Sequence, residues 1–200
     1  PHLLSGFVLE SSFPVPTYLS MNVSLPKSAY RSAATRLQQI NPADGDAKIA
    51  EAESDQRAGG PFRASVSTVE QGLSGSPSSA RGWMVLAELR ARHDPRGAGR
   101  ALTVSFQLDR RDYWFSGRRV RDAAKLWVAL PNEGKKEALE QVRLLWTEPA
   151  LRSQLEPLIA SDGGKEIVVL AFEGDREALR SLNRWRASAR RSKTQNSEHE

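Results

Sequence analysis

The chain has 200 residues, of which 39% are hydrophobic, and this suits one domain with its own core. It contains no cysteine, which excludes disulfides, thiolate metal sites and cysteine nucleophiles. Two of its three histidines lie within two residues of a terminus, so a histidine-built metal site or catalytic triad would depend on His93 alone. We therefore expect a non-catalytic protein with no cofactor and no metal.

The net charge of +5 is unevenly distributed along the chain. Residues 1–75 hold 6 Lys/Arg and 7 Asp/Glu, whereas residues 76–200 hold 23 and 17. A basic half can attract nucleic acid, but no zinc knuckle, helix-turn-helix or aromatic strand motif accompanies this charge. The sequence therefore argues against a nucleic acid partner.

Three features bear on localisation. The chain begins with Pro1, so we expect that an upstream piece has been removed, and residues 1–26 lack the Lys and Arg of a secretory signal. The longest clean apolar runs, such as Ile167–Phe172, are too short to span a membrane. A chain without cysteine suits the periplasm as well as the cytoplasm. We expect a bacterial periplasmic or membrane-associated protein, with the cytoplasm as the alternative.

Residues 1–25 are expected to form an extended N-terminal arm. This part of the chain mixes β-branched and aromatic residues with Ser and Pro and shows no helical period. Its apolar side chains should dock on the protein's own core or on a neighbour, because exposing them to water is unfavourable. They include Phe7, Val8, Leu9, Phe13, Tyr18 and Leu19.

From residue 26 onward the sequence predicts helices. Ala29, Ala33, Leu37 and Ile40 recur at three- and four-residue steps and predict a first helix near 26–39. Breaks containing Pro or Gly then recur, and most precede 12 to 18 residues rich in Ala, Leu, Arg, Glu and Gln. The run 167–172 differs, because its β-branched apolar residues suit a short buried strand.

The breaks are evenly spaced. Asn41-Pro42 and Ser76-Pro77 are 35 residues apart, and the segment between them predicts two helices of about 14 residues joined by a short turn. A period near 34 built from paired helices is typical of helical arrays. An irregular helical bundle with evenly spaced loops is the alternative.

Residues 80–110 resemble a tetratricopeptide repeat. Trp83, Leu86 and Ala87 match the aromatic, leucine and small positions of that family's first helix, and Ala98 opens the second helix. The stretch 105–110, SFQLDR, is similar to the family's closing ALELDP, although the turn between the helices is one residue shorter than usual. Small residues at these positions let paired helices pack closely.

Weaker versions of the same pattern flank this repeat. Upstream, Ala52 keeps the small position, while Lys48 and Glu51 replace the aromatic and the leucine. Downstream, the four signature positions are occupied by Val120, Ala123, Ala124 and Trp127. The resemblance implies an all-α fold: a right-handed superhelical array of antiparallel helix pairs with C-terminal capping helices. The implied helical domain covers 26–192, with repeats at about 45–76, 80–111 and 117–147, capping helices at 149–192 and a flexible tail at 193–200.

Two short segments carry a second resemblance. Residues 76–83, SPSSARGW, and 114–119, WFSGRR, are similar to repeat segments of proteobacterial envelope and exopolysaccharide-related proteins. This resemblance implies a place in the cell envelope.

The tetratricopeptide resemblance also implies a concave groove lined by the first helix of each pair. The residues implied to face it are Asp46, Ile49 and Glu53, then Arg81, Met84 and Glu88, then Arg118, Arg121 and Lys125. Such a groove would run from acidic to basic, and its arginines would pair with the carboxylates of an extended peptide. For each residue the alternative is an ordinary solvated helix face.

We therefore expect a protein-interaction scaffold or assembly subunit whose partner is another protein or an extended peptide, including one within a membrane-protein complex. The expected partner-binding residues are Arg81, Met84, Glu88, Trp114, Arg118, Arg121 and Lys125. The alternative is an accessory protein that binds polysaccharide or an anionic membrane surface. It would use Trp114 with the cluster of Arg110, Arg111, Arg118 and Arg119.

The C-terminal helix and Asp94 are best explained by structural roles. The C-terminal helix, residues 175–193, carries basic residues on one face and Leu179, Leu182 and Trp185 on another, so it could cap the array or lie on lipid or nucleic acid. Capping is the favoured role, since terminal repeats need a polar outer face. Asp94, beside His93, is expected to cap the helix that begins at Pro95.

Overall fold

The computed structural model describes residues 25–40, 44–111 and 113–197, and the described part is helical throughout, without a β-strand. The all-α prediction is thus confirmed. Within the same ranges no helix is long and apolar enough to cross a membrane. The predicted arm at 1–25 lies almost entirely outside the described residues.

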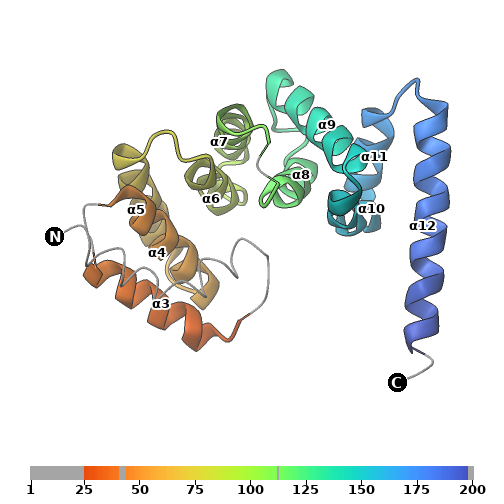
Figure 1. The fold of residues 1–200 in the computed structure, drawn as a ribbon. Helices are drawn as coiled ribbons and strands as arrows, with labels where there is room; N and C mark the ends of the chain where they lie inside the picture. The colour runs from red at the N-terminus through yellow and green to blue at the C-terminus, as the bar shows by residue number, and fades with distance from the viewer. Residues whose placement is uncertain (1–24, 41–43, 112, 198–200) are drawn as a thin grey trace.

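Ten α-helices and one 3-10 helix follow one another along the described chain (Figure 1). The first helix, α3, spans Lys27–Ile40. Three helix pairs come next: α4 Gly45–Ala58 with α5 Phe62–Gly75, α6 Ala80–Arg90 with α7 Pro95–Leu108, and α8 Ser116–Lys125 with α9 Asn132–Thr147. The C-terminal part comprises the 3-10 helix Pro149–Leu155, α10 Glu156–Ala160, α11 Asp162–Ala171 and α12 Arg176–Ser197.

The helix boundaries follow from local chemistry. The side chains of Asp44, Ser79 and Asp94 accept hydrogen bonds from backbone N–H groups in the first turns of α4, α6 and α7. At Asp94 the bond from Gly97 N is 2.8 Å, which confirms the predicted cap. Gly59 ends α4 in the left-handed conformation at φ 87°, which a residue without Cβ adopts most easily.

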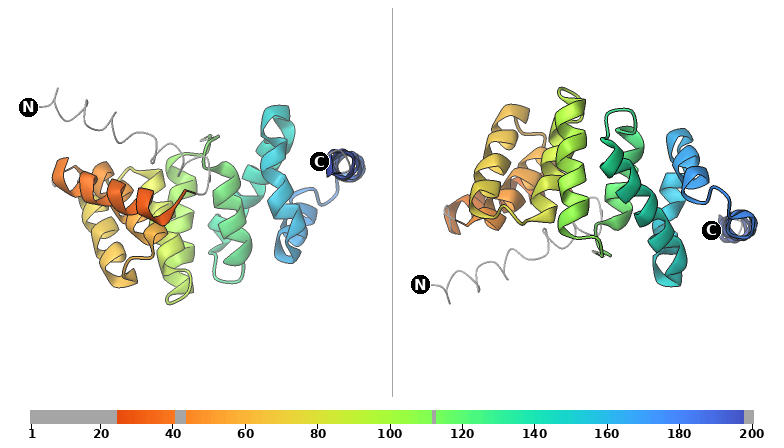
Figure 2. Two further views of the ribbon diagram at one scale, coloured as in Figure 1. Left: turned by 90° about the horizontal axis from the view of Figure 1, so that it is seen from below. Right: turned by 90° about the horizontal axis from the view of Figure 1, so that it is seen from above.

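The helix pairs stand side by side in chain order, with α3 at one end of the row and α12 at the other (Figures 1 and 2). One apolar cluster joins α4 to α9, and a second joins α8 and α9 to α10, α11 and α12. Close approach of α4 and α5 depends on glycine, because a Cβ on Gly72 would lie 2.7 Å from Gly45 O. The array thus has two main apolar clusters, and the partly buried Trp127 packs against both.

Two sequence expectations differ from the structure at the C-terminal end. The short buried strand considered for residues 167–172 does not form, because residues 162–171 form α11 with Ser161 as its cap. Ile167, Val168 and Ala171 are buried while Val169 and Leu170 are exposed, which is a helical period that the β-branched composition hid. Furthermore, α12 continues to Ser197 and so includes much of the segment expected to be a tail.

Candidate functional site

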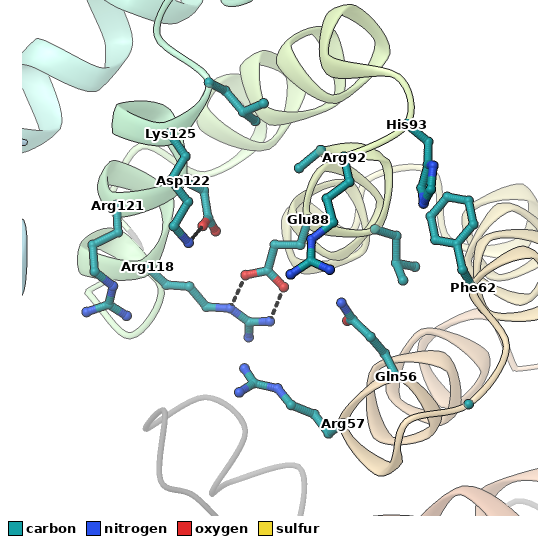
Figure 3. Close-up of a pocket in the computed structure, with 14 residues that line it drawn as sticks. Gln56, Arg57, Phe62, Glu88, Arg92, His93, Arg118, Arg121, Asp122 and Lys125 are labelled. Carbon is teal, nitrogen blue, oxygen red and sulfur yellow. Dashed lines mark hydrogen bonds and ion pairs between the residues drawn. The ribbon is translucent and has the colours of Figure 1, made fainter. Parts of the chain in front are cut away.

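A pocket of about 820 Å³ opens between the first helices of the three pairs, α4, α6 and α8 (Figure 3). The start of α5 and the turn after α6 complete its wall. Seven of its 14 lining residues are charged, and Phe62, Leu89 and Leu126 contribute large apolar side chains. The charged and polar residues that line it are Gln56, Arg57, Glu88, Arg92, His93, Arg118, Arg121, Asp122 and Lys125.

A buried network of ion pairs lies beside this pocket and shares Glu88 and Arg118 with its lining. Glu53 on α4 is 0% exposed and accepts bonds from Arg81 at 2.7 Å and from Arg118 at 2.5 Å. Arg118 on α8 also donates two bonds to Glu88 on α6, in the forked geometry typical of guanidinium and carboxylate (Figure 3). One arginine therefore joins the first helices of all three pairs.

The network fixes the charge state of its central groups. Burial alone would raise the pKa of Glu53, but Arg118 and Arg81 outweigh it and lower that pKa to about 2. Burial would likewise lower the pKa of Arg118, yet Glu53 and Glu88 hold it well above its usual range. Glu53 and Arg118 are therefore both ionised at neutral pH, and each depends on the other for its solvation.

Glu88 behaves differently from Glu53, although both lie beside Arg118. Burial raises the pKa of Glu88 to about 7, and the neighbouring Asp122 carboxylate adds to this rise against the opposing effect of Arg118. Asp122 itself accepts a bond from Lys125 at 2.8 Å. Glu88 thus changes charge near neutral pH at the edge of the pocket.

Counting charges separates two groups of cations. Within the network, Arg81, Arg118 and Lys125 balance Glu53, Asp122 and the ionised form of Glu88. Three further guanidiniums line the same pocket, and among the described residues none of them has an ion pair or a side-chain hydrogen bond. They belong to Arg57, Arg92 and Arg121, which we call the free arginines.

The free arginines come from three successive structural units. Arg57 lies in the last turn of α4, Arg92 in the turn after α6 and Arg121 on α8. Figure 3 shows Arg57 and Arg92 extending toward Arg118, with Arg121 beyond it on the same helix. The pocket therefore holds about three positive charges that the described protein does not neutralise.

The structure distributes the predicted partner-binding residues over four environments. Met84 is 0% exposed and packs in the interior, so its side chain is not offered to a ligand. Arg81, Glu88 and Arg118 belong to the ion network. Of the remaining predicted residues, Arg121 and Lys125 line the pocket, whereas Trp114 lies elsewhere and is 65% exposed.

Sequence reasoning missed Arg57 and Arg92. Each follows a groove glutamate, Glu53 or Glu88, by four residues, and the two Glu-x-x-x-Arg segments are 35 residues apart, which is the repeat spacing. Residues four apart share a helix face, so this recurrence was the signal that could have identified them. The positions that we expected to face the groove end at Glu53 and Glu88, one helical turn before Arg57 and Arg92.

The cluster proposed for polysaccharide or lipid is divided by the fold. Arg110 and Arg111 are exposed, but Arg118 and Arg119 are buried. Arg119 donates to the backbone oxygens of Ser105 at 2.9 Å and Asp109 at 2.6 Å. Two of the four expected cations therefore hold the fold together and do not face solvent.

Comparisons of the chain with known protein families, with curated proteins and with solved structures return no match. In the described ranges, no three His, Asp or Glu side chains gather as candidate metal ligands. What the pocket offers chemically is a concave surface lined by guanidiniums without ion-pair partners among the described residues.

Proposed function

We propose that this protein is a non-catalytic interaction scaffold that binds an extended acidic segment of a partner protein in the pocket formed by α4, α6 and α8. The observation that carries the proposal is that Arg57, Arg92 and Arg121 line one pocket and have no ion pair among the described residues. A guanidinium binds a carboxylate through two parallel hydrogen bonds, so three of them select a ligand with several carboxylates.

The shape of the pocket suits an extended peptide better than a flat membrane surface. Its volume of about 820 Å³ lies between helices, where a flat membrane cannot reach the side chains. The burial of Arg118 and Arg119 also leaves Trp114 with fewer accessible cations for a polysaccharide or lipid site. A narrow peptide segment satisfies both the shape and the charge of the pocket.

We further propose that the helix pairs are tetratricopeptide-like. Support comes from the starts of the first helices at residues 45, 80 and 116, and from the pocket's position on those helices. The recurring Glu-to-Arg ion pairs between one unit and the next, Glu53 with Arg81 and Glu88 with Arg118, also follow the repeat.

Selection from a random octapeptide library displayed on phage tests the proposed ligand class. We expect panning on the immobilised full chain to enrich peptides with several Asp or Glu residues. The enrichment should disappear with the triple variant Arg57→Gln, Arg92→Gln, Arg121→Gln and persist with Arg63→Gln, Arg96→Gln, Arg100→Gln, which removes the same charge from exposed positions on α5 and α7. Equal enrichment on both variants would refute the pocket as the site.

A further inference from the structure

The helix α12 carries the entire net positive charge of the protein. Between Arg176 and Ser197 the sequence has seven Lys or Arg residues and one acidic residue, Glu177, which gives +6. The whole chain has +5, so the other residues together carry −1. A surface that only has to stay in solution does not require its net charge to be concentrated on one helix at the end of the array.

One side of α12 packs against the body. Leu182 is 6% exposed, and Ala178, Leu179 and Trp185 are partly buried against the core of α9, α10 and α11. Trp185 meets Trp146 edge to face, with 6.0 Å between the ring centroids. These contacts turn the apolar side of the N-terminal half of α12 toward the body.

The opposite side of α12 presents a row of arginines. Arg176, Arg180 and Arg184 are exposed, and none has an ion pair within the described part of the chain. Their four-residue spacing aligns them on one face. At about 100° per residue, Arg180 lies roughly 160° around the helix from Leu182. The row therefore faces away from the body.

From this arrangement we propose that the outward face of α12 docks the protein onto an anionic phospholipid surface. Contact is electrostatic and stays at the level of the headgroups. Insertion is disfavoured because the large apolar side chains of α12 are committed to the body, and residues 186–197 contain no apolar residue larger than alanine. The pocket of α4, α6 and α8 plays no part in this contact.

A lipid surface fits the row better than a nucleic acid does. The row is straight and lies on the exposed side of one helix, so a planar layer of phosphates and carboxylates can neutralise all of its guanidiniums together. A nucleic acid backbone curves away from a straight helix unless that helix enters a groove, and side chains in the N-terminal half of α12 pack against the body.

Co-sedimentation of the full chain with lipid vesicles tests this proposal. We expect binding to vesicles of phosphatidylcholine with 30% phosphatidylserine at 0.1 M salt, no binding to pure phosphatidylcholine, and release at 0.5 M salt. The variant Arg176→Gln, Arg180→Gln, Arg184→Gln should bind roughly a hundredfold more weakly, because each cation near an anionic surface contributes about fivefold.

The control variant is Arg63→Gln, Arg96→Gln, Arg100→Gln, which changes the net charge equally and should bind the vesicles as the parent does. Thermal unfolding of both variants should match the parent, because all six side chains are exposed. Equal losses in the two variants, binding to neutral vesicles, or tighter binding to a duplex DNA oligonucleotide than to the anionic vesicles would each overturn the proposal.

Discussion

The two sets of arginines around one pocket differ in what surrounds them. Arg81 and Arg118 point at buried carboxylates and join the first helices of the three pairs. The free arginines line the same pocket and leave their charge to solvent. The role of a groove arginine therefore depends on whether a carboxylate of the neighbouring unit lies within reach, since such a partner makes the arginine structural and its absence leaves the arginine available for a ligand.

The largest effect that would sharpen this comparison is expected at Glu53. Glu53→Ala leaves Arg81 and Arg118 without their shared carboxylate, and removing one partner from a buried pair costs about 3–5 kcal/mol of unfolding free energy. Urea denaturation measures that loss. Glu166→Ala, at an exposed position on α11, is the matched control and should change the unfolding free energy by less than about 0.5 kcal/mol. Equal stability of the two variants would mean that the network does not hold the units together.

A smaller effect is expected from the charge of Glu88. Its pKa of about 7 means that lowering the pH from 8 to 6 adds a proton and makes the pocket more positive by almost one charge. Affinity for an acidic peptide should then rise about two- to threefold, as expected for one unit charge acting through largely aqueous surroundings. Isothermal titration at the two pH values measures this change.

Glu88→Gln should weaken that pH dependence and raise the affinity at pH 8 toward that of the parent at pH 6. His93 lines the same pocket, so His93→Gln is the necessary control and should keep the dependence. If His93→Gln removes the pH dependence and Glu88→Gln retains it, the pH dependence does not come from Glu88 and the prediction is wrong.

Much of the fold could be predicted because its signals are local. Caps such as Asp94, glycine and proline breaks and a period near 35 residues each constrain a short stretch of chain. The possible strand at 167–172 is a helix because composition and burial disagree there: Val169 and Leu170 face solvent although the run is apolar and β-branched.

The site was only partly predictable. The repeat pattern placed Arg118 and Arg121 on one helix face, but it could not tell that Glu53 and Glu88 from two other helices meet Arg118. That distinction depends on contacts between residues 30 and 65 positions apart. Arg57 and Arg92 could have been predicted, because each recurs four residues after one of those glutamates.

Binding of a fluorescent hexaglutamate peptide, followed by anisotropy at pH 7 and 0.15 M salt, tests the central claim most directly. We predict that Arg57→Gln, Arg92→Gln, Arg121→Gln folds as the parent does and loses at least tenfold in affinity. The equally charged variants Arg63→Gln, Arg96→Gln, Arg100→Gln and Arg176→Gln, Arg180→Gln, Arg184→Gln should bind within about twofold of the parent. Equal losses in all three variants would contradict a specific acidic-peptide site between α4, α6 and α8.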